Sequence, residues 1–349
     1  MTATTSSGSM EVIDVHGHLS APAELYSYKA RLLSARGFAG PDRPKISDDQ
    51  LREANAKHLK DLAGVGTDYQ LLSPRPYQLM SSEQPGEIVH WWVEENNELV
   101  ARTCALFPGT FGAVGALPQV YGEPIERSLD EARRCLERGF VGFLVNPDPS
   151  EGTGSVPTMA DPYWYPLYEF AVENDVPLMI HSAGCRNERL SYSLHFINEE
   201  SIALMAMLDW PGGGVFERFP QLRIICPHGG GSVPYQVGRW RVRSFSARGD
   251  DFQEALRRNI FFDTTIYSEA ALRLLVEEVG VDRVLFGTEK PGSGSALDPN
   301  TGEWFDDVRP KLLRLFGEER THEICHTNAR RVFRLDDRQG ALEVAAHGT

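Results

Sequence analysis

Two histidines separated by one glycine end the first apolar segment of the chain. His16 and His18 follow the run at 12–15, which is rich in β-branched residues and favours a strand. In an extended chain, residues two apart point to the same side, so both imidazoles should converge on one point. Gly17 leaves room there for a ligand. A metal ion fits this pattern, but a satisfied pair of structural histidines fits it equally well.

Polar side chains also end most of the other apolar segments of the chain. They are Arg75, Asn146, His181, His228, Asp263, Thr264 and Glu289. Imidazoles from His16, His18 and His181, with the carboxylate of Glu289, would form a site for Zn²⁺, or for Mn²⁺ or Fe²⁺. Asn146 stands where one type of two-metal site needs a bridging lysine, so a single divalent ion is favoured.

Such an ion would lower the pKa of a bound water towards ~7 and make hydroxide available at neutral pH. His228 could then act as a general acid or base, or polarise a substrate oxygen. Asp263 could either orient a ligand histidine or pair with Arg239. Glu289 could also be a buried carboxylate in a salt bridge, although a divalent cation would satisfy it as well.

Arginines near these positions indicate an acidic substrate. Arg75 and Arg239 carry planar guanidinium groups that bind carboxylates in bidentate fashion. Tyr192 could add a hydrogen bond to the substrate, and so could Asn146. A metal ion together with arginines predicts a small polycarboxylate. Arg186 and Arg189 could add further contacts to the carboxylates or could be ordinary loop charges. His195 is also expected on a loop, either near the site or away from it.

Short apolar segments and amphipathic segments alternate along the chain. The expected strands are 12–16, 69–73, 111–117, 140–146, 177–182, 223–228, 260–265 and 283–289, and helical spacing lies between them. Strands that are apolar on both faces belong to a parallel sheet covered by helices. Eight such units predict a (β/α)8 TIM barrel, in which the polar strand ends meet at one mouth.

The alternative architecture is an open doubly wound sheet. No glycine-rich dinucleotide motif follows the first strand, and the glycines at 229–231 lack the lysine of a phosphate-binding loop. The longest loop, 146–162, follows the fourth strand and could be a lid over the mouth or a tolerated surface insertion. We expect one barrel domain over residues 11–335, with a disordered leader or tag at 1–10 and a tail at 336–349.

Composition excludes several classes of function. The 349-residue chain has a net charge of −14, which argues against nucleic-acid binding. It has no apolar run of transmembrane length and no signal peptide, so no membrane partner is expected. Five dispersed cysteines without a CxxC pair indicate reduced thiols and a cytoplasmic location.

The motifs resemble the decarboxylase and hydratase branch of the amidohydrolase superfamily. The similar stretches are DVHGH at 14–18, IHS at 180–182, CPHGGGSVPYQVGR at 226–239 and VLFGTE at 284–289. Within this branch the chain looks most like the 4-oxalomesaconate hydratases, which carry Glu289 where most relatives have aspartate. The resemblance implies a zinc site of His16, His18, His181 and Glu289, with His228, Arg75 and Arg239 at the substrate.

The leading hypothesis is therefore a metal-dependent hydratase that adds water to an unsaturated keto-polycarboxylate. The first alternative is a non-oxidative decarboxylase of an aromatic or muconate-type acid, using the same residues. A further alternative is an iron- or manganese-dependent hydroxylase, or a catalytically silent partner subunit on the same scaffold. A homo-oligomer is expected, and a hetero-oligomer fits the last alternative.

Overall fold

The computed structural model describes residues 11–38, 40–189, 192–208, 214–247, 249–292 and 294–337. The side chains of residues 192 and 193 are outside this description. The predicted leader at 1–10 and most of the predicted tail at 336–349 also lie outside the described residues, so these two predictions stay open.

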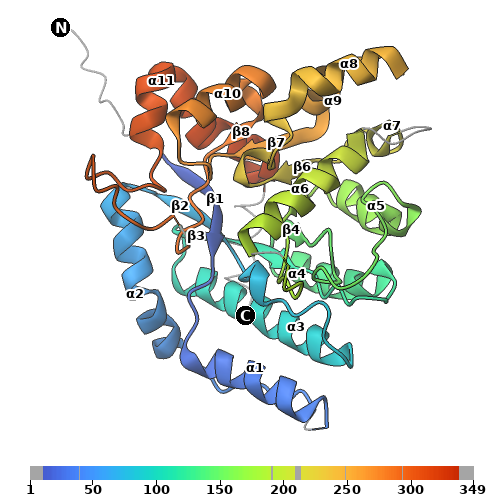
Figure 1. The fold of residues 1–349 in the computed structure, drawn as a ribbon. Coiled ribbons are helices and arrows are strands. Elements are labelled where there is room, and N and C mark those ends of the chain that lie inside the picture. The colour runs from blue at the N-terminus through green and yellow to red at the C-terminus, as the bar shows by residue number, and fades with distance from the viewer. Residues whose placement is uncertain are drawn as a thin grey trace, which may run out of the picture.

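Eight parallel strands follow one another in chain order around a barrel (Figure 1). They are β1 (Ile13–His18), β2 (Tyr69–Ser73), β3 (Phe111–Ala116), β4 (Gly142–Val145), β5 (Leu178–Ile180), β6 (Ile224–Cys226), β7 (Ile260–Asp263) and β8 (Val284–Leu285). The ring closes where the amide of Val15 donates to the carbonyl of Phe286 at 2.9 Å and Gly17 pairs with Lys290. The predicted (β/α)8 barrel is confirmed.

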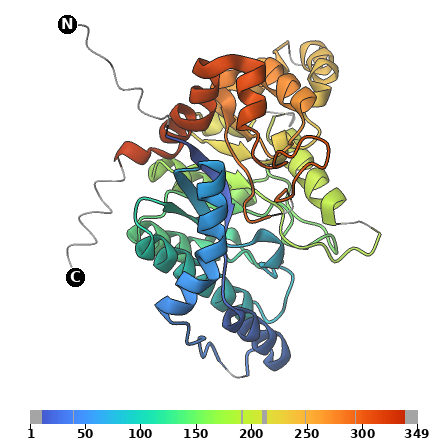
Figure 2. The same cartoon turned by 90° about the vertical axis from the view of Figure 1, so that its left-hand side faces the viewer.

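Helices surround the strands on the outside (Figures 1 and 2). They are α1 (Ala23–Ala35), α2 (Asp48–Val65), α3 (Glu87–Leu106), α4 (Leu129–Glu137), α5 (Tyr165–Glu173), α6 (Tyr192–Leu208), α7 (Val215–Arg218), α8 (Val237–Ala247), α9 (Phe252–Asn259), α10 (Glu269–Val279), α11 (Arg309–His322) and α12 (Asn328–Phe333). Between β1 and β2 the chain makes two helices, α1 and α2, drawn in blue.

The apolar core has two parts. A small cluster joins alternate residues of the strands, such as Val15, Leu71 and Phe261, with Val332 and Phe333 of α12. Such a cluster can form only inside a closed barrel, and α12 caps it. The larger cluster fills the space between the strands and the surrounding helices. Burial of apolar side chains on both faces of the strands is what a parallel barrel requires.

A β-bulge in β1 lies between Asp14 and Gly17 and includes His16. Asp14 pairs with Gln70 but Gly17 pairs with Leu72, so an advance of three residues along β1 matches an advance of two residues along β2. A bulge re-aims the side chains that follow it. The alternation of an ideal strand does not predict this change.

Asp14 holds the ring closed beside this bulge. Its buried carboxylate accepts hydrogen bonds from the Thr288 hydroxyl at 2.5 Å, the Gln70 amide at 2.8 Å and two backbone N–H groups. Burial raises the pKa of Asp14 despite these bonds. β8 therefore ends at Leu285 rather than continuing to 289 as expected, because the chain turns to bind Asp14.

The expected loop position of His195 is wrong, because α6 begins at Tyr192. The segment 192–208 contains neither glycine nor proline, so nothing in it ends the helix early. His195 consequently lies on a helix and not on a loop.

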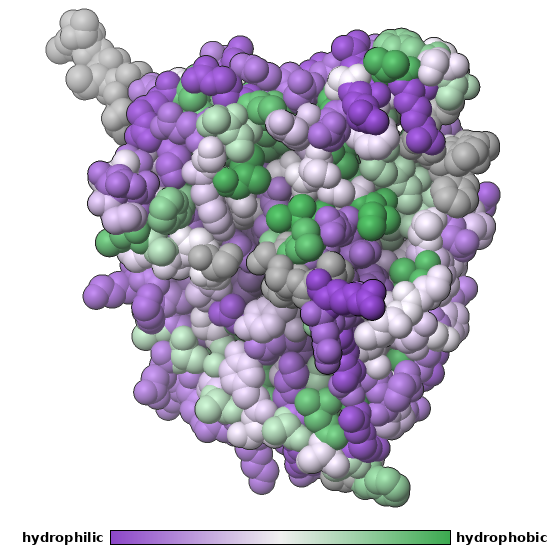
Figure 3. Space-filling view, in the orientation of Figure 1, coloured by the Kyte–Doolittle hydropathy of each residue, from purple (hydrophilic) through white to green (hydrophobic). Residues whose placement is uncertain are grey.

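The described surface is mixed in character. Figure 3 shows hydrophilic side chains over most of one face, with hydrophobic side chains in scattered groups. No described helix has the length and apolar character needed to cross a membrane. All five cysteines are free.

We expect the Thr288→Val variant to be less stable than the wild type by about 1–3 kcal/mol, because it removes a buried donor from the Asp14 carboxylate. Urea unfolding followed by circular dichroism measures this difference. Thr158→Val, at an exposed position, should change the free energy of unfolding by no more than ~0.5 kcal/mol. Equal effects of the two variants would contradict the role of Thr288.

Candidate active site

Four histidines from three strands meet at one end of the barrel. The ring of His16 lies 5.0 Å from that of His18, 5.2 Å from that of His181 and 5.5 Å from that of His228, measured between centroids. Ligand atoms of His16, His181, His228 and Glu289 all lie within 4.8 Å of one another. Side chains more than 270 residues apart in the sequence therefore share one small volume.

His16 is oriented by a buried carboxylate. Its Nδ1 lies 2.6 Å from Oδ2 of Asp263, and both side chains are buried. Burial would raise the pKa of Asp263, but the hydrogen bond and charge of His16 lower it to about 2. An ionised carboxylate can only accept, so Nδ1 donates to it, and Nε2 presents a lone pair whenever the ring is neutral. The Nε2 atom has no partner among the described residues.

His181 and His18 are fixed in the same tautomer by different acceptors. Nδ1 of His181 donates to the Ser182 carbonyl at 3.1 Å, and its buried Nε2 has no partner in the described part of the chain. Nδ1 of His18 lies 3.0 Å from the hydroxyl of Ser73, which itself donates to the Gly17 carbonyl. The serine oxygen must therefore accept from His18, and the Nε2 lone pair of His18 is left available.

Burial lowers the pKa of both His18 and His181 well below the usual value, and the neighbouring imidazoles add to this effect. Both rings are thus neutral at pH 7. Neutral imidazoles with oriented lone pairs are the form in which histidine binds a metal ion. The orphaned Nε2 atoms show that the residues present fit a divalent metal ion.

His228 is held by a second buried carboxylate, Glu200 of α6. Both oxygens of Glu200 lie 3.0 Å from Nδ1 of His228. Burial opposes protonation of the imidazole, but Glu200 raises the pKa of His228 to about 9. Phe196 packs against the same ring at 4.5 Å. His228 is therefore a positioned group that can carry and deliver a proton.

Glu289 reaches the cluster through an unusual backbone conformation. Its φ is +63° and that of His228 is +52°, both in the left-handed region that non-glycine residues rarely adopt. The amide of Glu289 donates to the His16 carbonyl at 2.7 Å, and Tyr267 Oη lies 3.4 Å from Oε2 of Glu289. Strain at two positions of one cluster is typical of a functional site.

The predicted substrate residues differ in their burial and in their hydrogen-bond partners. Arg75 is half-buried, donates to the Pro291 carbonyl at 3.0 Å, and its charge contributes to the low pKa of His18. The side-chain amide of Asn146 is occupied by Ser81, Asp148 and Ala183, so it braces the loops. Arg239 is exposed on α8. The side chain of Tyr192 lies outside the described residues.

Asp263 takes one of the two roles predicted for it. It binds His16, so the alternative pairing with Arg239 does not occur within the described structure. Glu200 and Ser73 were not predicted at all, because an acid inside a helix and a serine at a strand end are common features. Arg186, half of whose side chain is exposed, contacts Ser82 and Glu83 and joins two mouth loops.

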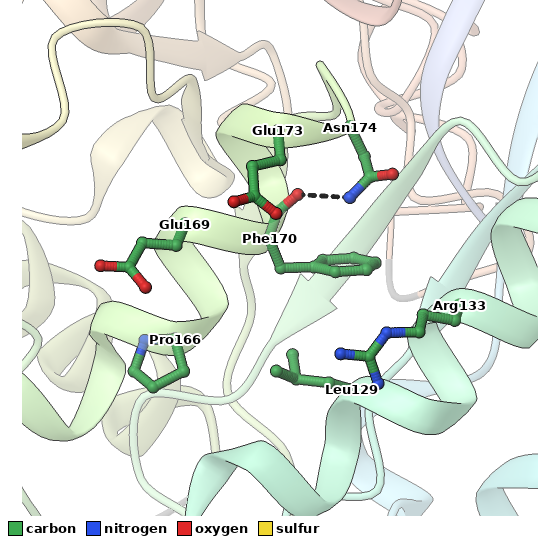
Figure 4. Close-up of a pocket in the computed structure, with 7 residues that line it drawn as sticks. All are labelled: Leu129, Arg133, Pro166, Glu169, Phe170, Glu173 and Asn174. Carbon is green, nitrogen blue, oxygen red and sulfur yellow. Dashed lines mark hydrogen bonds between the residues drawn. The ribbon is translucent and has the colours of Figure 1, made fainter.

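Two surface hollows differ in their lining residues and in their position on the barrel. One of about 410 Å³ opens among loops that follow the strand ends and includes Lys29, Tyr77, Glu151 and Arg186 in its lining. The other, of about 370 Å³, lies between α4 and α5, where Asn174 donates to the Phe170 carbonyl (Figure 4). Neither lining includes one of the clustered histidines, but the first hollow lies among the loops that follow the strand ends, at the end of the barrel where the histidines meet.

A family model described as amidohydrolase matches residues 13–335. The chain belongs to the amidohydrolase family. This amidohydrolase is 36% identical over 335 residues to the 2-keto-4-carboxy-3-hexenedioate hydratase of Sphingobium sp., covering 94% of this chain and 97% of that protein. The expected family is thereby confirmed.

Two further relatives are a hydratase and a decarboxylase. It matches the crystal structure of 4-oxalomesaconate hydratase from Rhodopseudomonas palustris with a TM-score of 0.85 and 34% identity, covering 96% of this chain and 100% of that one. It is 27% identical to the gamma-resorcylate decarboxylase of Rhizobium radiobacter over 338 residues, covering 90% and 98%. Hydratases and decarboxylases are both lyases, and this amidohydrolase is a lyase-type enzyme with a divalent-metal site.

We expect the Asp263→Asn variant to bind a divalent ion ~10–100-fold more weakly, because His16 loses the carboxylate that orients it and raises its basicity. Competition with a chromophoric chelator measures the affinity. Asp130→Asn, which changes an exposed carboxylate paired with Arg133, is the matched control. Equal affinities in the two variants would show that Asp263 does not support the metal site.

Proposed function

We propose that this amidohydrolase adds water to the conjugated double bond of a small unsaturated keto-polycarboxylate, of the 4-oxalomesaconate type. The observation that carries the proposal is that His16 and His181 have buried Nε2 atoms without partners among the described residues and share a group of ligand atoms, all within 4.8 Å, with Glu289. The 36% and 34% identities to two hydratases over nearly the whole chain support the same reaction.

The metal ligands in this proposal are His16, His18, His181 and Glu289, and the ion is Zn²⁺. Three imidazoles and one carboxylate suit this ion. A bound divalent ion polarises substrate oxygens and makes a coordinated water acidic near neutral pH. In this proposal His18 replaces the His228 of the 4.8 Å group, because its ring lies 5.0 Å from that of His16 and Ser73 holds its Nδ1, whereas His228 is held by Glu200.

The protein's own groups carry the protons. The carboxylate of Glu289 takes a proton from the attacking water, whose oxygen bonds to the alkene carbon. The π electrons move onto the ketone oxygen and form an enolate, which the N–H of His228 stabilises by a hydrogen bond. The ketone returns as His228 gives its proton to the neighbouring carbon. Glu289 then releases the proton it took from water and His228 takes one up, so both groups are restored and one water is added in total.

Arg75 supplies the orientation that this addition requires. Its half-buried guanidinium lies near His18, so it can bind a substrate carboxylate beside the reacting carbon. Arg239 remains a predicted second contact, on the helix that follows the His228 loop. Fixing the carboxylates holds the alkene in one pose. The orientational entropy is then lost on binding and not in the chemical step, which lowers the barrier.

The second candidate is non-oxidative decarboxylation. The 27% identity to gamma-resorcylate decarboxylase over 90% of this chain favours it, because the same clustered groups could bind a carboxylate and place a proton on carbon. Hydration consumes a conjugated alkene and releases no gas, whereas decarboxylation releases CO₂. The two candidates are therefore separable in one assay.

We expect Zn²⁺-loaded enzyme to bleach the ultraviolet absorbance of 4-oxalomesaconate without release of CO₂, because addition of water breaks the conjugation. Absorbance spectroscopy and a coupled CO₂ assay on the same sample measure both events. Glu289→Gln serves as the background. Release of CO₂ from this acid or from a hydroxybenzoate, with no bleaching by hydration, would replace the hydratase with the second candidate.

Substitution of two neighbouring histidines should separate metal binding from proton transfer. We expect His18→Asn to lose the ion, and His228→Asn to keep it while kcat/KM falls ~10²–10⁴-fold, the range of general acid–base catalysis. Metal content by mass spectrometry and initial rates measure the two effects. If His228→Asn loses the ion and His18→Asn keeps it, the ligand set above is wrong.

A further inference from the structure

A second group of metal-binding side chains lies outside the candidate active site. Asp148 lies in the loop after β4, and His195 and Glu199 lie one helical turn apart on α6. One ligand atom from each of the three lies within 4.8 Å of the other two. Residues four apart share one face of a helix, so both α6 side chains are directed to the same loop.

His195 is the unusual member of this group. It is only 1% exposed, yet neither of its ring nitrogens has a hydrogen-bond partner among the described residues. Its Nε2 lies 3.8 Å from Oδ2 of Asp148, which is too long for a hydrogen bond. Leaving a buried polar group unpaired costs about 1–3 kcal/mol. The imidazole is therefore placed for a partner that the described residues do not provide.

Burial lowers the pKa of His195, so the ring is neutral at pH 7 and cannot form a charged pair with Asp148. Burial and the Asp148 charge raise the pKa of the half-buried Glu199 to about 7. Two acids and a neutral imidazole thus surround one point without a cation from the chain. A divalent ion would relieve the repulsion and use the free nitrogen.

Asp148 is held in place for this role by its own loop. Its Oδ1 accepts from the amide and hydroxyl of Ser150, and its Oδ2 accepts from the amide of Gly152 at 2.6 Å. These bonds fix the carboxylate and leave lone pairs free on the oxygen nearest His195. A separation of 3.8 Å between nitrogen and oxygen suits two ligands that each bind one ion at roughly 2.0–2.2 Å.

We propose that Asp148, His195 and Glu199 bind a second divalent cation, Zn²⁺, separate from the ion of the candidate active site. Three protein ligands leave one position of a tetrahedral ion for water. The proposal does not depend on the reaction that the enzyme catalyses. It rests on three side chains that the hydratase mechanism does not use.

The second ion would connect two parts of the barrel mouth. It would tie the loop at 146–162 to α6, and the same helix presents Phe196 and Glu200 to His228. Glu200 follows Glu199 directly and points to the neighbouring face of the helix. The site is thus placed to stiffen the helix that orients His228, and its role is positioning rather than contact with substrate.

We expect wild-type protein, loaded with excess Zn²⁺ and then desalted, to hold two ions per chain by mass spectrometry. His195→Gln and Asp148→Asn should each hold one, His181→Asn should also hold one, and the His181→Asn/His195→Gln double variant should hold none. His58→Gln is the matched control, since His58 is also a buried histidine without partners but lies outside this group. It should keep two ions.

Glu199→Gln, at a half-buried position, provides a test in a variant that retains its fold. Once the first site is filled, further Zn²⁺ should raise the melting temperature of the wild type and not that of Glu199→Gln. One ion per wild-type chain, an unchanged count in His195→Gln, or equal melting shifts in wild type and Glu199→Gln would each overturn the second site. A failure of the hydration assay would leave these counts unaffected.

Discussion

The candidate site depends on one constraint: an acceptor on one nitrogen of each buried imidazole fixes the other nitrogen as the one that offers a lone pair. Three kinds of acceptor meet it here. His16 uses the ionised carboxylate of Asp263, His181 uses the carbonyl of Ser182, and His18 uses the hydroxyl of Ser73. Because each acceptor comes from the barrel itself, the lone pairs are fixed before any ligand arrives.

The conformation of the backbone also brings these groups together. The bulge in β1 includes His16 and comes before His18, and the left-handed conformations of His228 and Glu289 turn two strand ends towards the same point. Each of these features is unfavourable locally, at about 1–3 kcal/mol for a strained residue. They persist because the surrounding barrel is closed and well packed.

Much of this arrangement follows from the sequence, for reasons of chain geometry. Apolar segments of strand length, alternating with amphipathic ones, predict a barrel, and a barrel brings His16, His181 and His228 to one mouth. What could not be predicted depends on contacts between distant segments. Glu200 is one of two adjacent acids in a helical sequence, and only the packing of α6 against His228 shows that its carboxylate is buried.

The seam of the barrel and the metal site are built from the same stretch of chain. β1 meets the segment after β8 where Asp14 binds Thr288, and His16, His18 and Glu289 lie within four residues of that junction. Opening the seam would therefore separate the ligands, and filling the site would hold the first and last strands together. Metal occupancy and the integrity of the ring are thus one linked equilibrium, and a chelator would loosen the enzyme first at the junction of its two end strands.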